Sequence, residues 1–339
     1  MRLDSLPSYC CTVEASEVFE RKRVDLVSST GLPYSVWRAC GVPHLGENQV
    51  LRDCVFYLYR SREDAEAGVK SGGTGFFVCV DSDAHKKHGV RYGYAVTNHH
   101  LVMHGHTVLR VNKRGGGFLV IETDPADWFF KPRSHDIAVA APELPDECAA
   151  RHVKLPDYLL SDEVLTEWPI GAGEDLFMIG RFVDYDGHET NEPAMRFGNI
   201  SVLKANVVRK NKFRGPCIIA DVRSRSGFSG SPVFVYSSVG GTLSGPIRPA
   251  RVRLLGIHFA QFPEYWEIQG GGQADQVSAE VCLQAAGKYV EGLSGMTLVE
   301  PAEAIFALLN EQGPRKQRES WDSEHTAHFH SHGYPPVLE

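Results

Sequence analysis

The sequence predicts an all-β chain made of two small antiparallel barrels or sandwiches. Two series of short segments, rich in β-branched and aromatic residues, are separated by Gly, Asn and Asp. The segments are too short for helices. A chain of 339 residues is also long enough for about two domains. These observations together favour one β-domain for each series of segments.

The first series follows an N-terminal extension, residues 1–48, which has no sustained periodicity. Its predicted strands are Cys54–Tyr59, Thr74–Val80, Tyr92–Thr97, Thr107–Val111 and Phe118–Ile121. We assign residues 49–145 to a first β-barrel. The polar stretch from Pro142 to Pro156 has the composition of a connector between the two units.

The second series predicts strands at Asp175–Ile179, Gly198–Leu203, Cys217–Ala220, Pro232–Tyr236 and Arg253–Ile257. Apolar residues at helical spacing, with a proline suited to the first turn, predict one helix over residues 299–309. We assign residues 146–310 to a second β-barrel that ends in this C-terminal helix. The polar residues 311–339 predict a flexible tail.

Composition and charge exclude several classes of protein. A net charge of −7 and a pI of about 6.1 give no general attraction to nucleic acid or to an anionic membrane. No apolar run approaches the ~18 to 20 residues of a spanning helix. The N-terminal residues lack the apolar core of a signal peptide. We therefore expect a cytoplasmic protein that binds neither nucleic acid nor membrane.

The pattern of the eight cysteines also favours a cytoplasmic protein. None has the C-x-x-C spacing of a zinc or redox site, and the adjacent Cys10 and Cys11 are poorly placed for a disulfide with each other. We expect eight reduced thiols, several of them buried.

Three segments carry residues that suit nucleophilic catalysis, in the order His, Asp, Ser. His99 and His100 follow a predicted strand, Asp136 stands at the head of another, and Ser229 lies among small residues before a third. A serine hydroxyl becomes nucleophilic when an imidazole accepts its proton, and a buried carboxylate orients that imidazole. Periodicity alone does not separate His99 from His100.

Taken together, these segments resemble the signatures of chymotrypsin-fold (trypsin-like) serine peptidases. The matching residues are Ala95-Val-Thr-Asn-His-His-Leu-Val102, Asp136-Ile-Ala-Val139 and Gly227-Phe-Ser-Gly-Ser-Pro-Val233. Within that family, the three segments most resemble those of bacterial HtrA-type and glutamyl-endopeptidase-type members. The resemblance covers roughly residues 50–310. It implies two six-stranded antiparallel β-barrels with a catalytic triad in the cleft between them.

By this resemblance, Ser229 is the nucleophile, Asp136 the orienting acid and His100 the general base. His100 is the third residue after the strand-ending Thr97, which is the position of the base in the family. The N–H groups of Gly227 and Ser229 are expected to form the oxyanion hole. The resemblance implies no cofactor and no metal, because the triad and the oxyanion hole supply the groups that the reaction needs.

Two residues depart from the pattern of the digestive members. Phe228 precedes the nucleophile where those enzymes carry an aspartate, so activation through an ion pair with a newly cut N-terminus is not expected. Leu101 follows the histidine where they carry a cysteine. Both departures fit an intracellular member without disulfides. The residues after the predicted helix are too few for a PDZ domain, so none is expected.

The segment Leu254–Ala260 resembles the strand that forms a wall of the S1 pocket. His258 occupies the position of a histidine that contacts an acidic or amide P1 side chain in some members, and Gly256 lies in the same strand. Arg223 is expected near the base of the pocket. These residues favour Glu or Gln at P1, whereas a histidine with a purely structural role would leave a pocket for apolar side chains.

Other interpretations of these residues differ in class. Asp124 and Asp127 are alternative acids, and His100 and His104 have the spacing of a metal pair on a helix. The tail histidines 325, 328, 330 and 332 could bind metal weakly. An α/β-hydrolase is excluded, because the serine precedes a strand and the residue order is reversed.

The main rival function is a latent or inactive scaffold of the same fold that binds peptides and needs a partner. In either case the expected ligand is a peptide or protein substrate, with a possible regulatory partner protein. The natural substrate and the oligomeric state are not predicted.

Overall fold

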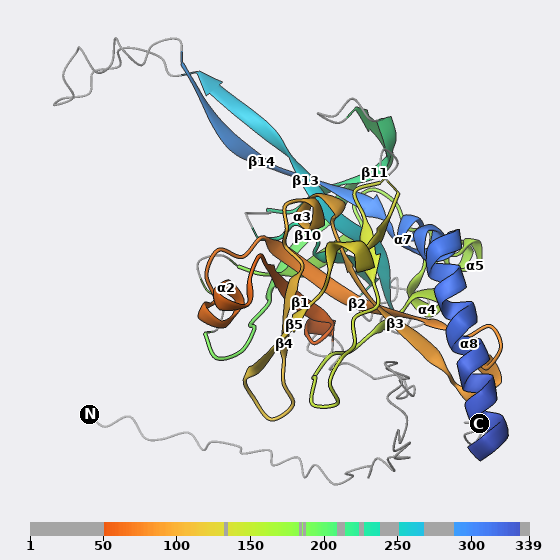
Figure 1. Ribbon diagram of the computed structural model, residues 1–339. Helices are drawn as coiled ribbons and strands as arrows, with labels where there is room; N and C mark the ends of the chain where they lie inside the picture. The colour runs from red at the N-terminus through yellow and green to blue at the C-terminus, as the bar shows by residue number, and fades with distance from the viewer. Residues whose placement is uncertain are drawn as a thin grey trace, which may run out of the picture. The chain divides into compact units, whose positions relative to one another are not determined.

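The computed structural model describes residues 51–131, 135–182, 185, 188–208, 214–223, 227–237, 251–267 and 288–332. These residues form two mainly antiparallel sheets, one after the other along the chain, followed by two helices (Figure 1). The prediction of an all-β chain with two β-units and a C-terminal helix is confirmed. The predicted N-terminal extension, residues 1–48, lies outside the described residues.

The first sheet has the strand order β5-β4-β1-β2-β3-β7-β6, and β8 pairs in parallel with β2. Its strands are β1 (Val55–Tyr59), β2 (Gly73–Asp81), β3 (Arg91–Thr97), β4 (Val108–Asn112), β5 (Phe118–Glu122), β6 (Phe129–Phe130), β7 (Ala138–Ala140) and β8 (Val153–Lys154). It therefore has eight strands where six were expected. The two-residue strands β6 and β8 are too short to leave an alternating pattern in the sequence.

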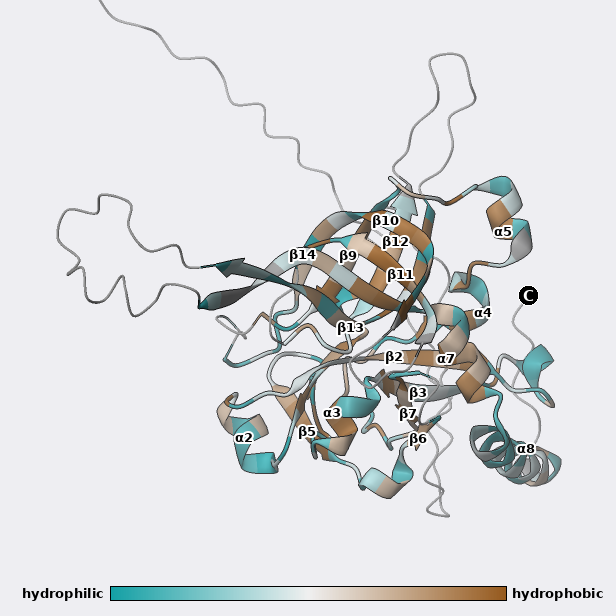
Figure 2. Cartoon of the chain, turned by 90° about the horizontal axis from the view of Figure 1, so that it is seen from above, coloured by the Kyte–Doolittle hydropathy of each residue, from teal (hydrophilic) through white to brown (hydrophobic). Residues whose placement is uncertain are grey.

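The second sheet closes into a barrel in the order β10-β11-β14-β13-β12-β9. Its strands are β9 (Asp175–Gly180), β10 (Ala194–Val208), β11 (Arg214–Asp221), β12 (Pro232–Ser237), β13 (Arg251–Glu267) and β14 (Tyr289–Pro301). Hydrophobic residues recur along these strands, as the hydropathy colouring shows (Figure 2). The expected six strands are thus present in this unit.

Short helical segments connect the strands. They are α2 (Arg62–Ala67), η1 (Lys86–His88), α3 (His99–Met103), η2 (Pro125–Asp127), α4 (Leu155–Tyr158) and α5 (Asp162–Glu167). The expected connector at residues 142–156 contains β8 and the first two residues of α4, so the first sheet continues to Lys154 and beyond the predicted boundary at residue 145. Tertiary pairing with β2 decides this, because two residues carry no strand pattern of their own.

The predicted helix at residues 299–309 begins later than expected. Residues up to Pro301 belong to β14, because Val299 and Glu300 pair with His258 and Ile257 of β13. Helix α7 then covers Ala302–Leu309. Pro301 stands at the start of the helix, where a missing N–H does no harm.

The prediction of a flexible tail is wrong for most of its length. Residues Gln312–His332 form helix α8, and residues 333–339 lie outside the described part of the chain. The buried side chains of α8 recur at spacings of four and three residues, but they are mostly polar, namely Arg318, Asp322, His325 and Phe329. The helix was not predicted because its sequence is polar. Tertiary contacts, and not an apolar stripe, stabilise it.

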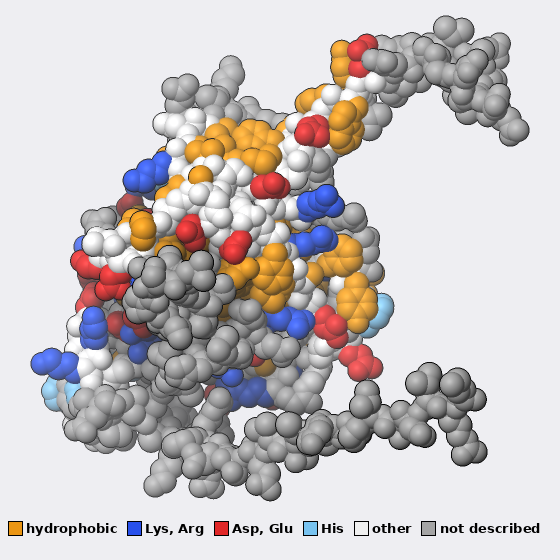
Figure 3. Space-filling view, turned by 180° about the vertical axis from the view of Figure 1, so that it is seen from behind, with side chains coloured by type: hydrophobic (Ala, Val, Ile, Leu, Met, Phe, Trp, Pro, Cys, Tyr) orange, Lys and Arg blue, Asp and Glu red, His pale blue; other side chains and the backbone are white. Residues whose placement is uncertain are grey.

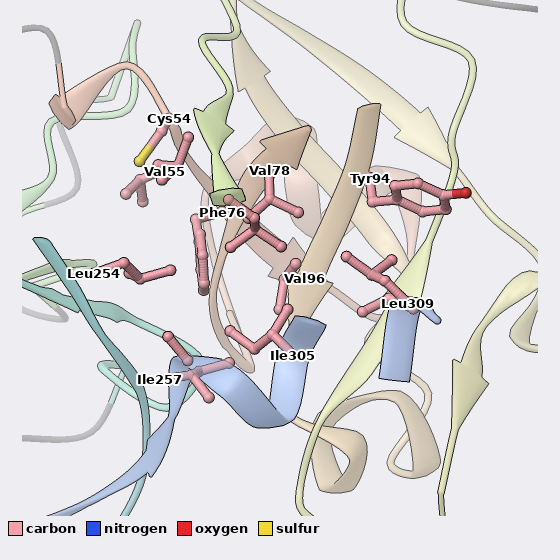
Figure 4. Close-up of a cluster of buried hydrophobic side chains, with 14 of the residues drawn as sticks. Cys54, Val55, Phe76, Val78, Tyr94, Val96, Leu254, Ile257, Ile305 and Leu309 are labelled. Carbon is pink, nitrogen blue, oxygen red and sulfur yellow. The ribbon is translucent and has the colours of Figure 1, made fainter. Parts of the chain in front are cut away.

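Both sheets and α7 contribute to one buried core (Figure 4). Phe76 and Val96 come from the first sheet, Ile257 from the second, and Ile305 and Leu309 from α7, all with no exposed surface. These apolar side chains pack against one another and exclude water. This packing fixes the position of one sheet relative to the other.

Beyond the barrel, β13 and β14 continue as a two-stranded ribbon, Pro263–Glu267 against Tyr289–Leu293. Tyr265, Trp266 and Tyr289 are among the most exposed large hydrophobic residues of the described chain. Hydrophobic and acidic side chains are visible along this ribbon (Figure 3).

Cys54, Cys79, Cys148 and Cys217 are buried and form no disulfide among the described residues. Burial raises the pKa of Cys148 to about 11 and that of Cys79 to about 12, so these thiols stay protonated at neutral pH. No helix among the described residues combines the length and the apolar character needed to cross a bilayer.

Candidate active site

Strand pairing places His100 beside Asp136. β3 ends at Thr97 and α3 begins at His99, while β7 begins at Ala138. β3 and β7 are antiparallel neighbours in which Thr97 pairs with Ala138. The residues that follow β3 therefore lie next to those that precede β7.

Asp136 is held at all four of its polar atoms. Its carboxylate accepts a hydrogen bond from the His100 backbone N–H at 2.9 Å and lies 2.6 Å from His100 Nδ1. Its carbonyl accepts from Asn98 Nδ2 at 2.9 Å, and its N–H donates to Glu300 Oε1 at 3.0 Å. Burial raises the pKa of Asp136, but the hydrogen bonds and charge of His100 outweigh it and leave this pKa below its ordinary value.

The structure separates the two histidines that spacing left open. His100 Nδ1 contacts the Asp136 carboxylate, and a carboxylate can only accept a hydrogen bond there, so Nδ1 carries a proton. His99 instead packs against Phe130, with ring centroids 4.4 Å apart, and burial lowers its pKa. The geometry of an oriented imidazole is therefore found at His100.

The loop that carries Ser229 is fixed between the two sheets. The Thr74 N–H of β2 donates to the Ser229 carbonyl at 2.8 Å. On the other side, His258 of β13 accepts from the Gly230 N–H and donates to the Ser231 carbonyl, both at 2.9 Å. Gly230 has a φ of +85°, and a Cβ there would lie 2.0 Å from the Thr74 carbonyl oxygen. Glycine is therefore required next to the serine.

Ser229 and His100 belong to segments that flank the same glycine. A Cβ on Gly73 would lie 2.7 Å from the Ser229 carbonyl oxygen and 2.7 Å from Leu101 Cδ1, the side chain that follows His100. Gly73 thus lets the serine loop and α3 approach each other closely. Within the described part of the chain, no hydrogen bond joins the Ser229 hydroxyl to the His100 imidazole.

The expected oxyanion residues have a defined backbone. Gly227 has a φ of +95°, which favours glycine, and its carbonyl accepts a hydrogen bond from the Thr74 hydroxyl at 2.7 Å. Phe228 between them is fully buried in the second barrel, and the Arg196 guanidinium lies 5.7 Å from its ring centroid. An apolar side chain in the barrel core therefore holds this loop where the digestive enzymes carry an aspartate.

The three expected S1 residues have different surroundings. His258 is 1% exposed, its Nδ1 lies 3.1 Å from the Phe228 carbonyl, and burial lowers its pKa to about 4. A Cβ on Gly256 would lie 1.8 Å from the Glu300 carbonyl oxygen, so this glycine is needed for strand packing. Arg223 is exposed, whereas His258 is buried.

The alternative acids cap a short helix, and the alternative metal ligands do not form a cluster among the described residues. Asp124 and Asp127 form a capping box around the short helix η2. The rings of His100 and His104 lie 6.3 Å apart. Among the described residues, no three His, Cys, Asp or Glu side chains gather closely enough to hold a metal ion. The tail histidines 325, 328, 330 and 332 lie in α8.

Three residues of this site were not predicted from the sequence, namely Thr74, Asn98 and Glu300. Thr74 and Asn98 stand at a strand start and a helix start, positions at which Thr and Asn are common. Glu300 carries the clearer signal, because it interrupts the apolar run Met296-Thr-Leu-Val-Glu-Pro301. A charged residue in a buried strand requires a partner, although the sequence does not say which one.

No family model matches the chain, and no curated protein matches it. Solved structures do resemble it. The protease domain of MamO from Magnetospirillum magneticum, in its apo form, has a TM-score of 0.45 and 16% identity over 78% of this chain and all of that one. The Rv3671c protease from M. tuberculosis, in its active form, has a TM-score of 0.40 and 18% identity over 88% of this chain and 93% of that one.

The HtrA-type protease AlgW, with a decapeptide, has a TM-score of 0.39 and 16% identity over 72% of this chain and 53% of that one. With TM-scores below 0.5, these structures do not establish the fold or the activity of this chain. Its fold is therefore assigned from its own strand order and barrel closure.

Proposed function

We propose that the chain is a serine endopeptidase that hydrolyses peptide bonds through an acyl-enzyme on Ser229. The observation that carries the proposal is the contact of 2.6 Å between His100 Nδ1 and the partly buried Asp136 carboxylate, beside the loop of Ser229. An imidazole fixed at Nδ1 by a carboxylate presents Nε2 as a base, which is the arrangement that activates a serine hydroxyl.

In the proposed reaction, Ser229 Oγ attacks the substrate carbonyl carbon while His100 Nε2 accepts the hydroxyl proton. The N–H groups of Gly227 and Ser229 stabilise the oxyanion, and His100 then donates its proton to the leaving amine. Water releases the acyl group by the same steps in reverse order. Asp136 stays ionised throughout, because its pKa is lowered by His100.

For the P1 side chain, we propose an amide or an apolar group in preference to a carboxylate. With a pKa of about 4, His258 is uncharged at neutral pH and offers a carboxylate no electrostatic attraction. Its Nδ1 faces the Phe228 carbonyl and must donate there, so Nε2 of the neutral ring is an acceptor. An acceptor at this position suits the N–H donors of a glutamine amide.

The test is labelling of the purified chain by a fluorophosphonate probe, followed by digestion of a peptide library. We expect the wild type to be labelled, Ser229→Ala to be unlabelled, and His100→Ala to react about 10⁴-fold more slowly. Ser201→Ala, a partly exposed serine on β10, serves as the matched control and should react like the wild type. Equal labelling of the wild type and Ser229→Ala would contradict the choice of nucleophile.

A second candidate is a latent form of the same fold that binds peptides and becomes reactive only with a partner. It is favoured by one observation, namely that no hydrogen bond joins Ser229 to His100 within the described residues. Labelling that appears only after peptide or a partner protein is added would favour this candidate. Labelling of the isolated chain would exclude it.

A further inference from the structure

Glu300 is a buried acid in the middle of an apolar strand. It lies on β14 of the second barrel between Val299 and Pro301, and none of its surface is exposed. Burial of a carboxylate is unfavourable unless hydrogen bonds replace its hydration. The hydrogen-bond partners of Glu300 therefore indicate its role.

Both oxygens of Glu300 contact the two residues at the head of β7. Oε1 accepts a hydrogen bond from the Asp136 N–H at 3.0 Å, and Oε2 lies 2.9 Å from His135 Nδ1. A carboxylate can only accept at this distance from a ring nitrogen, so His135 Nδ1 is the donor. Glu300 thus reaches from the second sheet to the backbone of the acid in the first sheet.

We infer that Glu300 is a positioning residue, which acts on the reaction by fixing Asp136 and, through it, His100. This inference rests on the proposed function. Asp136 has one backbone contact inside its own sheet, from Asn98, and one from the other sheet, from Glu300. Without Glu300 the partly buried Asp136 N–H would lose its acceptor, and the peptide would be free to rotate away from His100.

The same strand ties this contact to the serine. Glu300 pairs with Ile257 of β13, and the next residue, His258, holds Gly230 and Ser231 beside the nucleophile. Neighbouring positions on this one pair of strands therefore hold both the acid and the serine loop. Positioning of this kind changes the rate of the chemical step and leaves substrate binding largely unaltered.

The experiment compares Glu300→Leu with Glu300→Gln. Leucine fills similar space without an acceptor, whereas glutamine keeps one acceptor for the Asp136 N–H. We expect Glu300→Leu to lower the rate of fluorophosphonate labelling, and kcat on a cleaved peptide, by about 10- to 100-fold with KM unchanged. Glu300→Gln should restore the rate to within about tenfold of the wild type. Glu267→Leu, an exposed acid on β13, is the matched control.

A second readout does not depend on activity. The proton between His100 Nδ1 and Asp136 should give a low-field resonance in the proton NMR spectrum of the wild type, and this resonance should broaden or move in Glu300→Leu. If Glu300→Leu folds and keeps both the resonance and the labelling rate, the inference is overturned. If the wild type is not labelled but the resonance still depends on Glu300, the proposed function fails and the positioning role stands.

If Glu300→Leu does not fold, the inference is tested on the wild type and Glu300→Gln by NMR measurements on the Asp136 amide. The Asp136 amide should be protected from hydrogen exchange in the wild type, and its amide resonance should shift when the carboxyl acceptor is replaced by an amide oxygen in Glu300→Gln. Rapid exchange of this amide in the wild type, or an unchanged resonance in Glu300→Gln, would overturn the inference.

Discussion

Thr74 makes hydrogen bonds to two parts of the candidate site although it carries no group proposed for the chemistry. Its N–H donates to the Ser229 carbonyl at 2.8 Å, and its hydroxyl donates to the Gly227 carbonyl at 2.7 Å. Its carbonyl accepts from the Thr97 hydroxyl at 2.8 Å, at the end of the strand that precedes His100. One buried residue of the first sheet thus holds both the serine loop and the histidine segment.

Thr74→Val tests this role, because valine keeps the shape and removes the hydroxyl. The Gly227 carbonyl loses its donor, and the Arg181 N–H, 3.0 Å from the hydroxyl oxygen, loses its acceptor. We expect a loss of about 1 to 3 kcal/mol in the free energy of unfolding. We also expect slower fluorophosphonate labelling. Thr74→Ser keeps the hydroxyl and should restore the labelling rate, and equal labelling of Thr74→Val and wild type would contradict the role.

Helix α8 contacts the first sheet through buried polar and aromatic side chains. Asp322 accepts hydrogen bonds from the Ser82 hydroxyl and from the Tyr92 hydroxyl, the latter at 2.7 Å. The Trp321 ring lies 5.0 Å from that of Tyr92. These contacts lie past the end of β2 and at the start of β3, whereas Thr74 and Thr97 occupy the opposite ends of those strands.

Asp322→Ala should therefore lower stability and leave the site unchanged. The buried hydroxyls of Ser82 and Tyr92 lose an acceptor, so we expect the free energy of unfolding to fall by about 1 to 3 kcal/mol in urea titrations. Asp83→Ala, an exposed acid nearby, should have almost no effect. A variant that folds as stably as the wild type would show that α8 does not depend on this contact.

At the scale of the whole molecule, the candidate site lies where the two sheets meet. His100 and Asp136 come from the first sheet, and Ser229 comes from a loop that the second sheet holds through His258. The common core of both sheets and α7 keeps these groups in register. Any change that loosens contact between the sheets should therefore affect reactivity and stability together.

His258 links the stability of the whole chain to pH. Burial lowers its folded-state pKa to about 4, from an ordinary value near 6.5. Below pH 6.5 the unfolded chain binds a proton that the folded chain does not, so stability falls as the pH drops from 6.5 towards 4. We expect this residue to contribute about 2 kcal/mol of lost stability between pH 7 and pH 5.

The measurement is the free energy of unfolding in urea at pH 7 and pH 5, for the wild type and His258→Gln. The variant lacks the titrating group, so its stability should fall less over this interval, even if it is less stable at both values. An equal fall in both proteins would mean that another group carries the pH dependence.

The sequence alone predicts the local features of this protein. Alternation and β-branched residues indicate the strands, because side chains on a sheet repeat every two positions. The ten predicted strands all coincide with strands of the two sheets. The residues proposed for the chemistry also stand out in the sequence, since His100, Asp136 and Ser229 each lie where a short strand begins or ends.

The tertiary structure decides what depends on contacts between distant segments. It brings Nδ1 of His100, rather than His99, to Asp136, and it gives Glu300 its partners 164 and 165 positions earlier in the chain. It also converts the polar residues 312–332 into a helix, because their partners are side chains of the first sheet. Hydrogen bonds of buried polar groups are set by three-dimensional proximity, which the local pattern of a sequence does not encode.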